Sequence, residues 1–328
     1  MMKVLLFLAL LSWLLLYSAP GCSPHFTLSV GTTHSIYALP LRLAASADKP
    51  IFEENGLTVN IMYFPDRSQM ERALLRGEID AALDDLVGAV MLNKDSEQAK
   101  VVLTAMRAYP SGDMWAMVTA SRGVDTSPAN LYEGKVAIPK GMAARYVGHR
   151  LLVANGVDSG RVNWQEVDDG WQALEALEGG RATGALLPEP MLSLAVARGS
   201  RLVVGDRESL SDPFVILFSQ RVVKEQAAAI IRFTGSYEQA MWELNRNAER
   251  YRPLMAELAQ SPIEIGGKLP MPLFPFPSEV PTESEVEAIG QWLGEQRWLS
   301  PPLPYRHVVD PRFLPPPGKF APARCCLP

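Results

Sequence analysis

Short apolar segments alternate with amphipathic segments along most of the chain, and this order constrains the fold more than any other feature. Between about residues 26 and 207 the short segments have the length of strands, and stretches with helical spacing fit between most of them. The predicted strands are 26–30, 57–63, 81–83, 101–106, 114–119, 135–139, 162–167, 183–187 and 202–204, with one more at 214–220. A repeated strand–helix order is typical of a parallel sheet covered by helices on both faces. The sequence therefore predicts an α/β fold.

Local signals support the predicted helices. Asp169 stands where an N-cap is expected, with Gln172 three residues later and apolar side chains at helical spacing beyond it. Thr282 and Glu285 have the spacing of a capping box. Apolar residues at alternating steps of three and four predict a helix over 227–244.

Length, charge and cysteine content limit the function. The chain has 328 residues, which is enough for two domains or for one large two-lobed domain. Its net charge is -5 and it has no block of Lys and Arg, which argues against a nucleic-acid partner because phosphate binding needs clustered positive charge. Zinc-type Cys/His spacing, a glycine-rich nucleotide loop after a strand and a G-x-S-x-G motif are all absent from the sequence. We predict neither a cofactor nor a metal ion.

The N-terminus has the pattern of an export signal. Lys3 precedes an apolar run over 4–17, which at about 14 residues is too short to cross a membrane as a helix, and small residues then lead to Cys22. The segment resembles a bacterial lipoprotein signal, although 19–21 read Ala-Pro-Gly where such signals usually carry Leu at the third position before the Cys. We predict a signal peptide over 1–22 that leaves Cys22 for lipidation. The alternative is cleavage near Ala19, which leaves Cys22 an ordinary thiol.

The C-terminal segment differs in composition from the rest of the chain. Residues 315–328 are rich in proline and lack apolar periodicity, which predicts a disordered tail. Cys325 and Cys326 lie in this tail, so with Cys22 as the third cysteine the chain has no disulfide framework. We expect the two adjacent cysteines to be inert, and a vicinal disulfide or a metal role is the alternative.

Four longer segments form a pattern that is more specific than any one of them. They are GEIDAALDDLVGAVMLNK (77–94), VAIPKGMAARYVGHRLLVANGV (136–157), ALLPEPMLSLAVARGSRLV (185–203) and YRHVVDPRFL (305–314). Together they resemble extracytoplasmic solute-binding proteins of ABC importers, in the group that includes binders of sulfonates, nitrate and thiamine-pyrimidine precursors. The resemblance covers roughly residues 26–314, and the first and third segments in combination are its most specific part.

The resemblance implies a two-lobed periplasmic-binding-protein fold of type 2. Each lobe is expected to hold a mixed sheet flanked by helices, the chain crosses between lobes twice, and the ligand lies in the cleft between them. Lobe 1 would comprise 26–112 and 213–314, and lobe 2 would comprise 113–212. The implied protein is a monomer in the periplasm or at the cell surface, attached to a membrane through its lipid anchor. It delivers a small-molecule ligand to ABC permease and ATPase subunits and is not an enzyme.

Candidate ligand-binding residues follow from this fold, since ligands in such sheets bind outside the carboxyl ends of strands, where helix N-termini also point. They are Thr33, His34, Asp84, Asp85, Tyr109, Trp115, Lys140, Gly141, Met142 and Glu189.

Several candidates have a structural alternative. The small hydroxyl residues of loop 31–35 also fit a turn and a helix N-cap. Asp84, Asp85 and Glu189 either face the cleft or cap the helices that follow them. Trp115 either stacks on a ligand or packs between the lobes.

The charges predict a ligand class. Many proteins of the resembled group carry hydroxyl and amide side chains where this chain has 141–144 (Gly-Met-Ala-Ala), so a sulfonate or nitrate ligand is disfavoured. The alternative is that the backbone N–H groups at this helix start still hold an anion. Arg107 either clamps an anionic ligand or is a surface charge. If Glu189 and either Asp84 or Asp85 face the cleft, the pocket is acidic and favours a ligand with N–H donors or positive charge, such as an amino-substituted pyrimidine.

Two other functions remain open. An enzyme on the same scaffold would resemble pyrimidine synthases or menaquinone-pathway enzymes, and fold alone does not exclude it. The third possibility is a ligand-binding module that serves a sensor.

Overall fold

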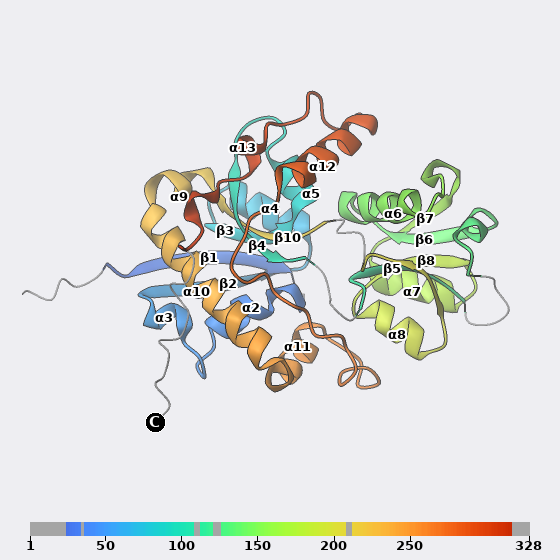
Figure 1. The fold of residues 1–328 in the computed structure, drawn as a ribbon, viewed down its shortest axis with the longest axis horizontal. Helices are drawn as coiled ribbons and strands as arrows, with labels where there is room; N and C mark the ends of the chain where they lie inside the picture. Colours follow the sequence, from blue (N-terminus) through green and yellow to red (C-terminus); the bar gives the residue numbers. More distant parts are fainter. Residues whose placement is uncertain (1–23, 34–35, 108–111, 121–125, 208–211, 317–328) are drawn as a thin grey trace, which may run out of the picture.

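A computed structural model describes residues 24–33, 36–107, 112–120, 126–207 and 212–316. Two five-stranded sheets, each flanked by helices, form two lobes side by side (Figure 1). This confirms the predicted two-lobed α/β fold. The predictions for Cys22, His34, Tyr109, Cys325 and Cys326 concern positions outside the described residues.

The first lobe contains the sheet β2-β1-β3-β10-β4. Its strands are β1 (Phe26–Thr33), β2 (Leu57–Phe64), β3 (Ala81–Asp85), β4 (Ala99–Met106) and β10 (Phe214–Ser219). Its helices are α2 (Leu39–Ala44), α3 (Ile51–Glu54), α4 (Arg67–Leu75), α5 (Leu86–Leu92), α9 (Gln220–Glu225), α10 (Ala227–Arg246), α11 (Arg252–Leu258), α12 (Glu283–Glu295) and α13 (Tyr305–Val308). Short 3-10 turns lie at Ile36–Ala38, Ala248–Tyr251 and Pro311–Phe313.

The second lobe contains the sheet β7-β6-β8-β5-β9. Its strands are β5 (Trp115–Thr119), β6 (Lys135–Pro139), β7 (Asn163–Val167), β8 (Gly184–Pro188) and β9 (Arg201–Gly205). Its helices are α6 (Met142–Ala154), α7 (Gly170–Glu178) and α8 (Met191–Ala197), with 3-10 turns η2 (Pro128–Tyr132) and η3 (Ser159–Arg161).

The sheets are mixed, as the resemblance implied, and the parallel order that the strand–helix alternation alone predicted does not hold for one strand in each lobe. β10 runs antiparallel to β3 and β4, and β5 runs antiparallel to β8 and β9. Both strands follow a passage of the chain from one sheet to the other. A strand that arrives this way needs no crossover helix to its neighbour, and antiparallel pairing is open to it.

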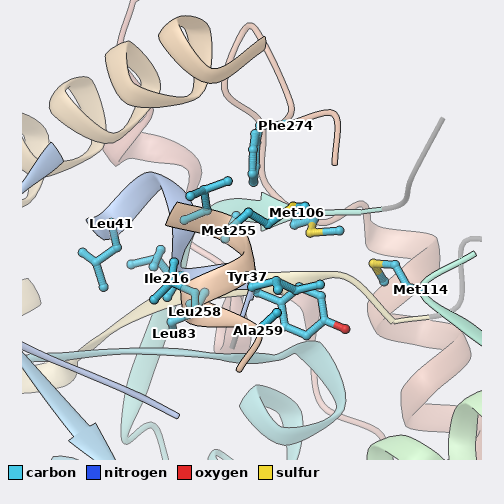
Figure 2. Packing of buried hydrophobic residues seen from close by; sticks show 14 of the residues in the cluster. Tyr37, Leu41, Leu83, Met106, Met114, Ile216, Met255, Leu258, Ala259 and Phe274 are labelled. Carbon is cyan, nitrogen blue, oxygen red and sulfur yellow. The ribbon is translucent and has the colours of Figure 1, made fainter. Parts of the chain in front are cut away.

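The core of the first lobe lies against the buried strands of its sheet. All eight residues of β4 are buried. Phe233 of α10 stacks on Phe52 at 5.2 Å between ring centroids and meets Phe218 edge to face at 5.3 Å. Figure 2 shows another part of the same cluster, where the hydroxyl end of Tyr37 points away from Leu41. These packed rings join α10 to α3 and to β10 in the core of the lobe.

The predicted helix signals are confirmed. Asp169 caps α7 by accepting a hydrogen bond from the Gln172 backbone N–H at 2.9 Å. Thr282 and Glu285 form a complete capping box at the start of α12. The helix predicted over 227–244 is α10. Among the described residues, no helix combines the length and the apolar character that crossing a membrane requires.

Candidate functional site

A cavity of about 340 Å³ lies between the lobes and takes its walls from both. The first lobe contributes the ends of β1 and β3, the start of α4 and the start of β10, and the second contributes the junctions β6–α6 and β8–α8. These are carboxyl ends of strands and starts of helices, as the fold leads us to expect. Of the predicted site residues, the cavity brings together Thr33, Asp84, Asp85, Trp115, Lys140, Gly141 and Glu189.

Asp85 has the capping role that the sequence left open. Its Oδ1 accepts a hydrogen bond from the Gly88 backbone N–H at 2.7 Å, which caps α5. Asp84 accepts a hydrogen bond from the Asp85 backbone N–H at 2.9 Å and lines the cavity beside it. Both aspartates are buried, so their charges need partners.

The partner of this pair is Arg67, which is not among the predicted site residues. Its guanidinium lies 2.9 Å from Asp84, 3.4 Å from Asp85 and 2.9 Å from Glu71. A Cβ at position 88 would lie 1.1 Å from Arg67 Nη2, so Gly88 leaves the space in which the guanidinium crosses the start of α5. The available signal was the position of Arg67 three residues after the end of β2, at a carboxyl end of the sheet.

A third aspartate approaches the same helix start from the segment that returns to the first lobe. Asp212 accepts hydrogen bonds from the backbone N–H groups of Leu86 and Val87, at 3.0 and 3.2 Å. Burial raises the pKa of Asp212 well above its ordinary value, and the neighbouring Asp85 adds to the effect. Burial also raises the pKa of Asp84 to about 7, although Arg67 opposes the shift. The carboxylates here outnumber the single guanidinium.

Glu189 is the buried carboxylate that the second lobe contributes to the cavity. It accepts hydrogen bonds from the Ser193 backbone N–H at 3.1 Å and from the Ser193 hydroxyl at 2.8 Å, while it also lines the cavity. Burial raises the pKa of Glu189 to about 7 despite these bonds. Pro190, the next residue, is the N-cap of α8.

Two further buried aspartates tie together the segments that pass between the lobes. Asp206 accepts a hydrogen bond from the Met114 backbone N–H at 2.8 Å, and Asp113 accepts one from the Arg207 backbone N–H at 2.8 Å. Burial raises the pKa of Asp206 to about 7, and the nearby Asp113 adds to it. A Cβ at Gly205 would lie 2.2 Å from Asp113 Oδ1, so only glycine fits without a shift.

Aromatic rings form the apolar part of the cavity. Tyr37 stacks on Phe214 with 3.7 Å between ring centroids, and both line the cavity together with Trp115 and Trp171. Trp115 also packs against two apolar clusters of the protein. Flat walls of this kind suit a planar ligand, because a ring buries a large area at low conformational cost.

The β6–α6 junction differs in part from the prediction. Lys140 lies at the cavity but pairs with Asp168 at 2.5 Å, and both side chains are largely exposed. Gly141 adopts a φ of 130°, a conformation that favours glycine, and it opens α6. Met142 does not line the cavity; its side chain packs on an apolar cluster that includes Trp292 of α12.

Arg107 is neither a clamp in the cavity nor a lone surface charge. Its guanidinium forms ion pairs with Glu279 and Glu285 of the first lobe, and Arg107 does not line the cavity. In the part of the chain that the structure describes, no group of three or more His, Cys, Asp and Glu side chains has a metal-binding arrangement.

Comparisons with known proteins bear on the fold. No family model and no curated protein matches the sequence. The periplasmic aliphatic sulphonate-binding protein SsuA of Escherichia coli superposes with a TM-score of 0.72 at 16% identity, over 88% of this chain and 98% of that one. The alkanesulfonate-binding protein SsuA of Xanthomonas axonopodis pv. citri, solved with MOPS bound, gives 0.68 at 18% identity over 86% and 97%.

An enzyme has a similar structure. The desulfurization enzyme DszB gives a TM-score of 0.67 at 12% identity, over 88% of this chain and 98% of its own. At these identities the comparisons establish the architecture alone. The chain has the two-lobed periplasmic-binding-protein fold, with a charged cavity between the lobes at the place where that fold is expected to bind ligands.

Proposed function

We propose that the protein is a solute-binding protein that encloses a small ligand between its lobes and hands it to an ABC permease and its ATPase. The observation that carries this proposal is the cavity whose walls come from both lobes. A ligand that touches both walls stabilises the closed arrangement through contacts that an open arrangement lacks, and so couples binding to closure. The fold similarity to two sulfonate-binding proteins supports the same role.

The ligand class follows from the charges. Arg67 forms ion pairs with Asp84, Asp85 and Glu71, and Lys140 forms one with Asp168, so both cations of the cavity already face carboxylates. A sulfonate entering the cavity would meet a surplus of buried carboxylate. A flat ligand with N–H donors or positive charge, such as an amino-substituted pyrimidine, would instead donate to these oxygens and stack on the rings.

A thermal-shift screen tests this ligand class. A ligand that binds only the folded protein stabilises it by about 2.7 kcal/mol at a concentration one hundred times its dissociation constant. We expect aminopyrimidines to raise the melting temperature in a panel that also contains flavins, sulfonates and aromatic acids. A panel in which only sulfonates or nitrate stabilise the protein would contradict the charge argument.

Export and anchoring are part of the proposal and follow from residues 1–22. The apolar run and Cys22 support secretion to the periplasm or the cell surface with a lipid on the cysteine. Cells that express the full chain and its Cys22→Ala variant, labelled with a fatty-acid precursor, test the anchor. Equal labelling of the two chains would remove Cys22 from the proposal, while export would be judged separately by fractionation.

The structural similarity to DszB makes enzymatic activity the second candidate function. Among the described residues that line the cavity there is no cysteine, histidine or serine, and its carboxylates are engaged as caps or ion pairs. Incubation of the protein with each stabilising ligand, followed by mass spectrometry, separates the two functions. Recovery of unchanged ligand is expected, and a stoichiometric or catalytic product would overturn the binding role.

A further inference from the structure

A second cavity, of about 230 Å³, lies between α6 and α12 and shares no lining residue with the ligand cavity. The second lobe contributes Arg145 and His149 of α6 with Trp164 of β7, and the first lobe contributes Trp292 and Gln296. Figure 1 shows α6 at the side of its lobe that faces α5 and α12. This cavity is therefore also interlobar, but it lies beside the cleft rather than in it.

Its size matches one ring. A cavity of roughly 150 Å³ holds a benzene molecule, so about 230 Å³ has room for a six-membered ring with one small substituent. The indole of Trp164 is held in place by a hydrogen bond from its Nε1 to the Ser159 carbonyl at 3.1 Å. The indole of Trp292 is held by edge-to-face contact with Tyr146 at 5.2 Å and with Trp298 at 5.5 Å. Two fixed indoles favour a flat, aromatic occupant.

The polar groups of the cavity favour an uncharged occupant. Arg145 pairs with Glu166 at 2.8 Å, so the two charges neutralise each other. Burial lowers the pKa of His149, which favours the neutral imidazole, and its Nδ1 shares a hydrogen bond with the Ser159 hydroxyl at 2.7 Å. The Gln296 amide and the imidazole can both donate and accept hydrogen bonds.

We infer that this cavity is a second binding site, for a neutral monocyclic aromatic compound that carries one hydrogen-bonding substituent. The compound would stack against the tryptophans and hydrogen-bond to His149 or Gln296. Trp292 and Gln296 belong to the first lobe, and the remaining lining residues belong to the second. An occupant that contacts both sides therefore holds α12 against α6. The site thereby favours one relative position of the lobes, whatever the cleft itself binds.

Benzamide is the probe, and nuclear magnetic resonance of the tryptophan indole N–H groups in the full chain is the readout. We expect saturable shifts at Trp164 and Trp292, with half-saturation at about 1 mM or below. Benzoate has the same ring with a charge and should bind at least tenfold more weakly. Shifts confined to Trp115 and Trp171, which line the cleft, would place the probe in the other cavity and overturn the inference.

Matched variants test the location. Gln296→Trp introduces a large ring from an exposed position at the edge of the cavity, and Gln291→Trp makes the same change at an exposed position of α12 that does not line it. Benzamide affinity should fall at least tenfold in Gln296→Trp and stay within twofold in Gln291→Trp. Equal binding by all three proteins contradicts the inference. If Gln296→Trp does not fold, absent or unsaturable shifts at Trp164 and Trp292 in the unaltered protein contradict it equally.

Discussion

Replacement of Glu189 by Gln distinguishes two effects of the buried carboxylate: its cost to folding stability and its contribution to ligand binding. Ionised Glu189 costs about 3 kcal/mol of folding stability above pH 8, because its pKa rises from 4.5 to about 7 and one pKa unit corresponds to about 1.4 kcal/mol. The glutamine side chain of this variant would still accept hydrogen bonds from Ser193 but more weakly, a loss of about 1 kcal/mol. The free energy of unfolding at pH 8.5 should therefore rise by about 2 kcal/mol.

The sign depends on pH. A carboxyl whose folded pKa is raised stabilises the protein while it is protonated, and that contribution is lost as the pH rises from about 4.5 through 7. The melting temperature of the Glu189→Gln variant should therefore be about 3 °C higher than that of the unaltered protein at pH 8.5, and this difference should disappear at pH 5. Affinity for a cationic ligand should fall at least tenfold at pH 8.5, because one acceptor charge is gone.

Urea unfolding at the two pH values and calorimetric titration are the assays. Glu178→Gln is the matched control, since Glu178 pairs with Arg198 on the exposed face of α7 and does not line the cavity. Its stability should change by no more than about 0.5 kcal/mol. A Glu189→Gln variant that is less stable by the same amount at both pH values would show that Glu189 is only a helix cap, and the reasoning would be refuted.

Two further substitutions test the charge network and the connection between the lobes. Arg67→Met removes the cation that compensates Asp84 and should cost about 3–5 kcal/mol at pH 8 in urea unfolding, with a smaller loss at pH 5, where Asp84 is protonated; equal losses would contradict this. Gly205→Ala places a methyl group 2.2 Å from Asp113 Oδ1 and should cost about 1–3 kcal/mol in thermal unfolding. Gly267→Ala, where the added carbon meets nothing within 4 Å, is its control, and equal effects of the two would refute the role given to Asp113.

The sequence predicted what depends on neighbours in the chain. Strands 135–139 and 214–220 are visible because short apolar runs are bounded by turn residues, and the structure has them as β6 and β10. The caps at Asp169 and Thr282 need only a partner three residues away. Such caps can be predicted from a short stretch of sequence, since both partners lie within one turn of helix.

The site depended on contacts that the chain order hides. Arg67 and Asp84 are 17 residues apart in the sequence. Asp212 lies 126 residues from Leu86, and it accepts a hydrogen bond from the Leu86 backbone N–H. Nothing local marks such partners, because only the packed sheet brings them together. The sequence predicted an acidic cavity, but it did not predict that Arg67 would compensate the charge of Asp84 and Asp85. Chain order likewise did not show that Met142 packs against an apolar cluster and does not line the cavity.

The central claim is that the cleft between the lobes is an acidic site for a flat, N–H-rich or cationic ligand. Calorimetric titration with a methylated aminopyrimidine that carries a fixed positive charge tests it most directly, because only groups of the protein then titrate. We predict one site per chain, with affinity at least tenfold higher at pH 8 than at pH 6, since Asp84 and Glu189 lose their charge below about pH 7. Tight binding of methanesulfonate, with no heat from the aminopyrimidine at either pH, would contradict the account.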